Sequence, residues 1–263
     1  PDGDWHFAPK LICVHGLTRN GRDFDVLASQ LAADGYHVVA PDMVGRGRSD
    51  RMADPGLYAL PQYLADCITL IARLDTDRVN WLGTSMGGLI GMAIAAQPGH
   101  QIGRMMLNDV GPVLSAEGLA RIKTYVGLDE RYDSFEEAEA ALRVTMASFG
   151  PHDDTQFRLL SKHYLVNKGS QWGAHYDPAI AKPFHDGYTG KDMALWPLYD
   201  PIDVPVRVLR GAESDLLSAE VAAEMASRGP KADCVVFDGV GHAPTLITDD
   251  QVKAVQDFFP AVS

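Results

Sequence analysis

The sequence predicts an α/β fold, with a mostly parallel, doubly wound sheet that is interrupted by one helical insertion. In the first 110 residues, short apolar runs alternate with segments of helical periodicity, as expected for parallel strands connected by helices. The strand runs are apolar at consecutive positions, which is typical of strands buried on both faces. The alternation stops after Gly111-Pro112 and resumes near Val206, which indicates the insertion.

Each expected element rests on a local pattern. Residues 60–74 carry apolar side chains at steps of three and four, as in an amphipathic helix, whereas residues 11–14 and 79–82 are short apolar runs. The expected strands are 11–14, 37–40, 79–82, 104–108, 206–209 and 233–237, and the expected helices are 23–33, 60–74, 86–96 and 249–259.

The inserted segment differs in character from the flanking sequence. Residues 115–192 show helical patterns and loops but no convincing strand. We therefore predict one core domain of residues 1–112 and 200–263, with a helical cap of residues 113–199. Ligand sites in such sheets lie beyond the carboxyl ends of the strands, so the cap is expected to roof the site.

Composition excludes several classes of protein and partner. The 263 residues are 46% apolar and 22% charged, which is ordinary for a globular chain and argues against disorder or a disulfide-stapled miniprotein. With 23 basic and 35 acidic residues the net charge is −12. Such a surface repels nucleic acid and anionic lipid, so neither is expected as a partner. No apolar run approaches the ~20 residues that span a bilayer. The oligomeric state is left open.

The cysteines and glycines predict neither a metal nor a nucleotide cofactor. Cys13, Cys67 and Cys234 are odd in number, lie in apolar contexts and form no C-x-x-C pair. They are expected to be buried thiols in a reducing, cytoplasmic compartment, and no signal peptide is apparent. No Cys/His cluster predicts a metal. The loop Asp42-Met43-Val44-Gly45-Arg46-Gly47-Arg48-Ser49 lacks the Lys-Ser/Thr of a phosphate-binding loop, so its Asp42 and arginines are expected to hold neighbouring loops.

The motif Gly83-Thr84-Ser85-Met86-Gly87 predicts a serine nucleophile. It follows an expected strand and opens an expected helix, which is the context of a nucleophile elbow. Such a turn holds its serine in a strained backbone conformation, and the flanking glycines avoid clashes with the adjacent strand and helix.

A serine nucleophile needs a base, and the base needs an orienting acid. His242 follows the last expected strand in a Gly-flanked loop and is the candidate base. Asp215 follows the strand at 206–209 and is the candidate acid, with Glu213 and Asp109 as rivals. The oxyanion is expected to meet the backbone N–H groups of Met86 and Leu17, whereas His15 is expected to order its loop.

The chain resembles the α/β-hydrolase superfamily, specifically its cap-bearing bacterial esterase-like serine hydrolases. Six segments carry the resemblance: HGLTRNGRDF, DMVGRGRS, GTSMGG, NDVGP, RGAESDLLS and GVGHAPTL. The resemblance implies the α/β-hydrolase fold, a triad of Ser85, Asp215 and His242, and oxyanion donors at Leu17 and Met86. Members usually have two strands before the His-Gly strand, but only ten residues precede Leu11, so the first strand is expected to be missing.

The resemblance favours hydrolysis of a small carboxylic ester or lactone through an acyl-enzyme. One alternative is a carbon–carbon bond hydrolase of aromatic ring-fission products, whose members share the elbow and the cap. Another is a non-catalytic ligand-binding protein on the same fold, against which the intact triad argues. Serine at position 85 excludes the dehalogenases and epoxide hydrolases of this fold, which use an aspartate nucleophile.

The substrate pocket is expected to be mostly apolar. Leu17, Met86, Leu216 and Leu217 are predicted to form its mouth, with Arg19 as the nearest cation for a substrate carboxylate. Four cap residues can either line the pocket or form the core of the cap: Tyr125, Trp172, His175 and Tyr176. Of these, Tyr125 and Trp172 are predicted, with Arg19 and Leu216, to contact substrate.

Overall fold

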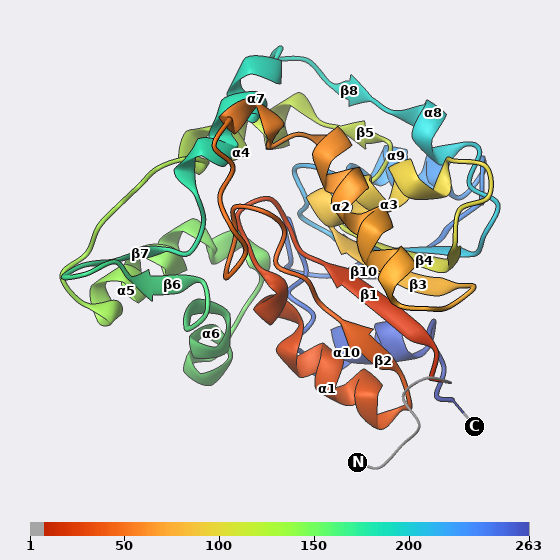
Figure 1. Ribbon diagram of the computed structural model, residues 1–263, viewed down its shortest axis with the longest axis horizontal. Coiled ribbons are helices and arrows are strands. Elements are labelled where there is room, and N and C mark those ends of the chain that lie inside the picture. Colours follow the sequence, from red (N-terminus) through yellow and green to blue (C-terminus); the bar gives the residue numbers. More distant parts are fainter. Residues whose placement is uncertain (1–7, 263) are drawn as a thin grey trace.

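A six-stranded parallel sheet forms the centre of the molecule (Figure 1). The computed structural model describes residues 8–262. The strands are β1 (Lys10–Val14), β2 (His37–Val39), β3 (Val79–Thr84), β4 (Ile102–Asn108), β9 (Val206–Gly211) and β10 (Asp233–Phe237). Their spatial order is β10-β9-β4-β3-β1-β2, and every neighbouring pair is parallel. This confirms the predicted fold class and the six expected strands.

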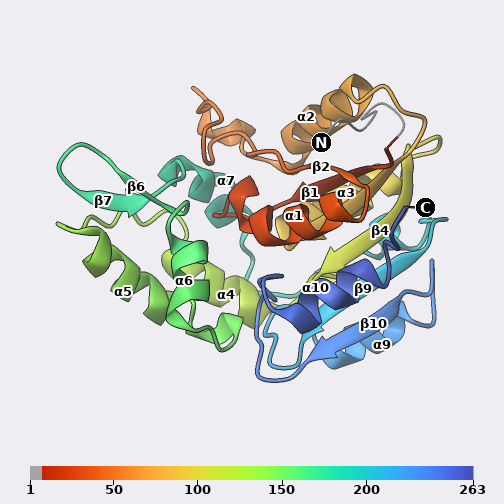
Figure 2. The ribbon, with the colours of Figure 1, turned by 90° about the horizontal axis from the view of Figure 1, so that it is seen from below.

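Helices cover both faces of the sheet (Figure 2). Along β1 the side chains alternate: Leu11 and Cys13 belong to one hydrophobic cluster, and Ile12 and Val14 belong to the other. The first cluster includes residues of α1 (Asp25–Ala33), which follows a 3-10 turn at Gly21–Phe24, and of α10 (Asp249–Gln256). The second includes residues of α2 (Leu60–Arg73), α3 (Met86–Ala95) and α9 (Ala219–Met225). Two-sided burial explains why the strands read as continuous apolar runs.

In helices α2 and α3, the residue pattern of the sequence matches the faces that are buried. In α2, Tyr63, Cys67 and Ile71 recur every four residues and are buried, which is the spacing of one face of an α-helix. Helix α3 is buried around almost its whole circumference, and Gly91 allows its close approach to the sheet. A Cβ added at Gly91 would lie 2.3 Å from Nε1 of Trp81.

Residues 113–199 lie outside the central sheet. Their helices are α4 (Ala116–Tyr125), α5 (Phe135–Thr145), α6 (Asp154–Ser161), α7 (Ala181–Gly187) and α8 (Trp196–Tyr199). Side chains of Ser115, Ser134 and Asp153 cap α4, α5 and α6 respectively, by accepting from backbone N–H groups of the first turn. Helices α5 and α6 share a small hydrophobic cluster with Ile247 of the core. The boundaries of the cap stay a prediction.

Two short strand pairs correct the expectation that this segment has no strand. β5 (Val113–Leu114) pairs with β8 (Met193–Ala194), and β6 (Leu165–Asn167) pairs with β7 (Trp172–Ala174), both antiparallel. Strands of two or three residues are too short to show a periodicity in sequence, so the pattern could not reveal them.

One cysteine also differs from expectation. Cys13 and Cys67 are buried, but Cys234 on the edge strand β10 is exposed. An edge strand has a neighbour on only one side, so its apolar sequence context does not ensure burial. Among residues 8–262, no helix is long and apolar enough to cross a membrane. The expectation about a missing strand before Leu11 falls largely on residues 1–7, outside those described.

Candidate active site

The parallel strands bring the loops that carry the candidate catalytic residues to one edge of the sheet. β3, β4 and β9 are neighbours, and β10 flanks β9. Ser85 directly follows β3, Asp109 directly follows β4, and His242 lies in the loop after β10. Because all these strands run in the same direction, their carboxyl ends meet at the same edge.

Ser85 occupies the strained turn that the motif predicts. Its backbone has φ 52° and ψ −113°, a conformation that costs a non-glycine residue free energy and is typical of functional turns. The flanking glycines permit the turn. A Cβ at Gly83 would lie 2.3 Å from the backbone of Gly87, and one at Gly87 would lie 2.0 Å from the carbonyl oxygen of Val14.

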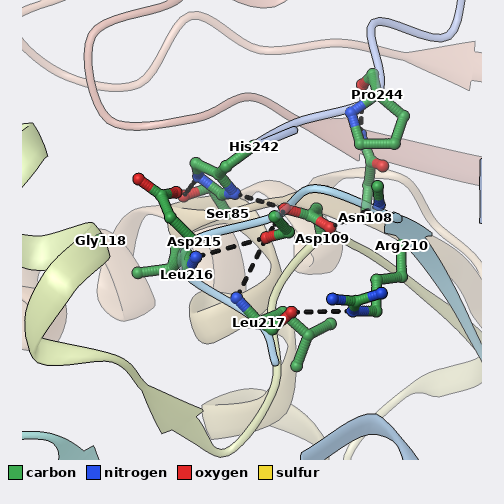
Figure 3. Close-up of polar contacts among 12 residues, drawn as sticks. Ser85, Asn108, Asp109, Gly118, Arg210, Asp215, Leu216, Leu217, His242 and Pro244 are labelled. Atoms are coloured by element: carbon green, nitrogen blue, oxygen red, sulfur yellow. Dashed lines mark hydrogen bonds and ion pairs between the residues drawn. The ribbon is translucent and has the colours of Figure 1, made fainter. Parts of the chain in front are cut away.

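His242 lies between Ser85 and Asp109 (Figure 3). Its Nε2 is 3.0 Å from Ser85 Oγ, and its Nδ1 is 2.7 Å from Asp109 Oδ2. The carboxylate accepts the proton of Nδ1, which leaves Nε2 as the nitrogen that accepts from Ser85. The three side chains thus form a hydrogen-bonded line from hydroxyl to carboxylate.

Asp109 is held more firmly than a surface acid would be. It is fully buried, and its backbone φ of 53° lies in the left-handed region that non-glycine residues seldom adopt. Oδ1 accepts from the backbone N–H of Gly211 at 2.8 Å, and Oδ2 also accepts from Ser214 Oγ at 2.6 Å. These bonds satisfy a charge whose burial would otherwise be costly.

Asp215, the acid predicted from sequence, forms no hydrogen bond with His242 among the residues described, which corrects that prediction. Its carboxylate forms a bidentate ion pair with Arg121 of α4, with Nη2 to Oδ1 at 3.0 Å. Burial raises the pKa of Asp215, but the hydrogen bond and charge of Arg121 outweigh it and hold the pKa below its usual range. Asp109, kept in the sequence analysis as a rival, takes the position against the histidine.

Ser214 is a site residue that the sequence analysis missed. Its Oγ donates to Asp109 and accepts from the N–H groups of Leu217 at 3.1 Å and Leu216 at 3.3 Å. It therefore joins the loop after β9 to the acid after β4. A serine directly before the acid candidate in RGAESD was the available signal, but nothing local showed which carboxylate it would meet.

The role of the two predicted oxyanion donors stays a prediction, with which their surroundings are compatible. Among the residues that the structure describes, neither the N–H of Leu17 nor that of Met86 has a hydrogen-bond acceptor. Met86 begins α3 directly after Ser85, where the helix dipole favours negative charge. A Cβ at Gly16, next to Leu17, would lie 3.7 Å from Cβ of Ser85, so this loop passes close to the nucleophile.

Buried polar side chains fix the loop that carries Leu17. Arg46 is fully buried, and its Nε donates to the carbonyl oxygen of Leu17 at 2.8 Å, while Nη1 donates to Tyr63. His15 accepts from the N–H of Met43 at 2.9 Å, and burial lowers its pKa to about 4. His15 is therefore neutral and orders the loop, as expected.

Asp42 of the same glycine-rich segment also holds neighbouring backbone. It accepts from the N–H groups of Gly21 and Arg48, both at 2.8 Å. This agrees with the expectation that the segment is structural and holds adjacent loops.

A chamber with a volume of about 630 Å³, including its open mouth, adjoins the nucleophile. We call it the first chamber. Its wall contains Ser85 and His242 together with apolar side chains, among them Leu17, Ile122 and Met146. Two of the four predicted substrate contacts, Arg19 and Tyr125, also line it.

The other two predicted contacts lie elsewhere. Trp172 of β7 packs edge-on against Phe135, with ring centroids 5.1 Å apart. Leu216 is 2% exposed and Leu217 is fully buried, so they belong to the core and not to the pocket mouth. Neither Trp172 nor Leu216 lines the first chamber. An apolar residue close to the site in sequence can either line the pocket or pack in the core, and only the tertiary structure shows which of these it does.

Arg19 has a largely satisfied guanidinium. Its Nε and Nη2 donate to Asp23 at 2.7 and 2.6 Å, and Nη2 also donates to the carbonyl oxygen of Leu160. Burial lowers the pKa of Arg19, but the charge and hydrogen bond of Asp23 outweigh it and keep the side chain charged. Because Asp23 balances this charge, Arg19 is a weaker attractor for a substrate carboxylate than its sequence position suggests.

The loop that carries His242 is held from the inserted segment. The N–H of Gly241 donates to the carbonyl oxygen of Ser148 at 2.6 Å. His152 Nε2 lies 2.8 Å from Oγ1 of Thr245. Hydrogen bonds from residues 148–152 therefore hold the histidine loop.

Comparisons with known proteins agree with this fold. A model of the alpha/beta hydrolase family matches residues 11–255. A 3-hydroxybutyrate-oligomer hydrolase of Cupriavidus necator is 47% identical over 257 residues, which is 95% of this chain and 87% of the relative. An esterase of Mycobacterium tuberculosis is 27% identical over 257 residues, covering 94% and 80%.

A solved structure is similar over almost the same extent. The crystal structure of an alpha/beta hydrolase from Novosphingobium aromaticivorans has a TM-score of 0.88 and 40% identity, covering 97% of this chain and 90% of that one. Together these relatives support hydrolysis, with ester cleavage among its forms, as the general reaction.

Proposed function

Because the chain belongs to the α/β hydrolase family, we propose that it is a serine hydrolase that cleaves short oligoesters of hydroxy acids through an acyl-enzyme. The observation that carries the proposal is the line from Ser85 Oγ through His242 to Asp109, with distances of 3.0 and 2.7 Å. A serine, a base and a buried orienting acid in this order are the groups that acyl transfer requires.

In the acylation step, Ser85 Oγ attacks the ester carbonyl carbon while its proton passes to Nε2 of His242. The negative charge that develops on the carbonyl oxygen is stabilised by the N–H groups of Leu17 and Met86. The tetrahedral intermediate then collapses as His242 gives its proton to the leaving alkoxide, which departs as an alcohol. The acyl group remains on Ser85.

In the deacylation step, a water molecule takes the place of the alcohol. His242 accepts a proton from the water, whose oxygen attacks the acyl carbonyl carbon. Collapse of the second intermediate returns the proton to Ser85 and releases the carboxylic acid. Asp109 remains ionised throughout and stabilises the imidazolium that forms twice in each turnover.

The substrate class follows from the relative and from the pocket. The Cupriavidus relative is a 3-hydroxybutyrate-oligomer hydrolase, and this chain aligns with 87% of its length. The first chamber combines apolar walls with the hydroxyl groups of Thr18, Tyr125 and Tyr164. An oligoester has apolar methyl or methylene groups and a carbonyl acceptor in each repeat unit, which such a wall complements.

Residues 113–199 act in this proposal as the cap predicted from sequence. Ile122 and Tyr125 of α4 and Leu142 of α5 contribute to the wall of the first chamber. Closure by these helices excludes bulk water from the acyl-enzyme, which strengthens the oxyanion hydrogen bonds.

The test is a substrate panel with a nucleophile variant. We expect turnover of p-nitrophenyl butyrate and of 3-hydroxybutyrate dimers and trimers, and labelling of Ser85 alone by a fluorophosphonate in peptide mapping. Ser85→Ala should lose about 10³-fold or more in kcat.

The panel also includes a lactone and a ring-fission dienol. If kcat/KM for the dienol exceeds that of every ester by more than ~100-fold, carbon–carbon hydrolysis replaces ester hydrolysis as the function. Labelling of another serine, with Ser85 unmodified in active protein, would overturn the nucleophile assignment.

A further inference from the structure

A second chamber adjoins the first within the inserted segment. It has a volume of about 480 Å³, including its mouth, and all its lining residues fall between positions 125 and 176. The two chambers share Tyr125, Leu142, Thr145 and Tyr164 as common walls. Together they extend the site well beyond the volume next to Ser85.

The lining of the second chamber is mostly uncharged, which suits a neutral, oxygen-rich ligand chain. Its apolar wall includes Leu128, Ala138 and Ala141, and its only charged lining residue is Glu130, among the residues described. No cation faces a substrate carboxylate there, and the Glu130 carboxylate repels one. A neutral ester repeat is therefore favoured over a dicarboxylate.

Tyr125 supplies a hydrogen-bond donor at the junction of the chambers. Tyr125 lines both chambers, and a phenol hydroxyl can donate one hydrogen bond. Burial raises the pKa of Tyr125, so the hydroxyl keeps its proton at neutral pH.

We propose that the second chamber binds the second repeat unit of the oligoester, with Tyr125 donating a hydrogen bond to the ester carbonyl of that unit. This subsite rests on the proposed function, because Ser85 must cleave an ester bond in the first chamber. It gives the second chamber a role in selecting oligomers over single-unit esters.

The experiment compares kcat/KM for 3-hydroxybutyrate dimer and trimer with that for p-nitrophenyl butyrate, whose acyl group occupies the first chamber only. Ala141→Phe places a ring in the second chamber, since Ala141 lines that chamber and not the first. Ala140→Phe is the matched control, because Ala140 is exposed on the same helix and lines neither chamber. The readout is the ratio of oligomer to single-unit kcat/KM in each variant.

We expect Ala141→Phe to lower the trimer-to-butyrate ratio by about tenfold or more, because overfilling excludes the second unit. Ala140→Phe should keep the wild-type ratio. Tyr125→Phe removes one hydrogen bond to the second unit and should lower the ratio by about fivefold. It also tests the subsite if Ala141→Phe does not fold.

The possible outcomes separate the two proposals. If p-nitrophenyl butyrate and the oligomers are all left intact by protein with labelled Ser85, the proposed function fails. If the butyrate ester is cleaved but the ratio is unchanged in both Ala141→Phe and Tyr125→Phe, the second-unit subsite is wrong and ester hydrolysis stands. A ratio that falls equally in Ala140→Phe would also overturn the subsite.

Discussion

Replacing Asp109 by asparagine should disable the candidate site while leaving its shape intact. The carboxylate accepts three hydrogen bonds, from Nδ1 of His242, from Oγ of Ser214 and from the N–H of Gly211. An amide has one oxygen and one NH₂ group, so it cannot accept from both sides. In one orientation the NH₂ group faces His242, and in the other it faces Gly211.

Both orientations impair the chemistry. If the NH₂ group faces Nδ1, the imidazole must carry its proton on Nε2, which can then no longer accept the proton of Ser85. If the amide oxygen faces Nδ1, the base survives but no negative charge stabilises the imidazolium. We expect kcat to fall by about 10⁴-fold, which corresponds to about 5 kcal/mol in the activation free energy.

Asp215→Asn is the matched control. Its ion pair with Arg121 is partly exposed, with side-chain exposures of 22% and 30%, and such pairs contribute at most about 1 kcal/mol to stability. Because the Asp215 carboxylate forms no hydrogen bond with His242, kcat should fall less than about fivefold, the kinetic equivalent of that free energy.

The assay is steady-state hydrolysis of p-nitrophenyl butyrate by both variants, with the concentration of folded protein checked by thermal melting. Asp109→Asn should lower kcat with little change in KM, because it affects the transition state and not substrate binding. A larger loss in Asp215→Asn than in Asp109→Asn would refute the assignment of the acid.

Three further outcomes test the supports of the site. Arg46→Met removes the donor that holds the loop of Leu17 through its backbone carbonyl. In a steady-state assay, kcat should therefore fall by about tenfold to 10²-fold. Unchanged kinetics would show that the loop does not need this hydrogen bond. Burial lowers the pKa of His152 below its ordinary value, so the folded state binds this proton more weakly than the unfolded state and loses stability as pH falls through that ordinary value. His152→Gln, which can still hydrogen-bond to Thr245, should therefore show a smaller loss of Tm between pH 7.5 and 5.5 than wild type, and an equal loss would contradict the assignment. Gly87→Ala should yield no folded protein, because its Cβ would lie 2.0 Å from a β1 carbonyl oxygen, whereas Gly187→Ala, with nothing within 4 Å, should melt like wild type; circular dichroism on both distinguishes a steric from a general effect.

Sequence patterns were sufficient for the architecture because they record local physics. Residues 60–74 were predicted as a helix from their apolar spacing, and α2 spans Leu60–Arg73. The run at 79–82 was predicted as a strand, and β3 spans Val79–Thr84. Each pattern reflects burial of a face that the element itself defines. The short pairs β5–β8 and β6–β7 were missed because two or three residues define no such pattern.

The nucleophile and base could also be predicted from local sequence. Gly83 and Gly87 are required by the backbone of the turn that exposes Ser85, so the motif is a direct consequence of steric limits. His242 was singled out by its loop after the last strand, and the structure places its Nε2 within hydrogen-bond distance of Ser85.

The choice of acid was decided by tertiary structure alone. Asp109 and Asp215 both follow strands at the same edge of the sheet, and no local pattern ranks one above the other. The structure pairs Asp215 with Arg121, which lies 94 residues away in sequence, and brings His242 to Asp109 across 133 residues. Sequence by itself determined the elements, the elbow and the candidate carboxylates, because steric and burial rules act between near neighbours. Which carboxylate meets the histidine depends on where separate segments pack, and that is fixed only when the whole chain has folded.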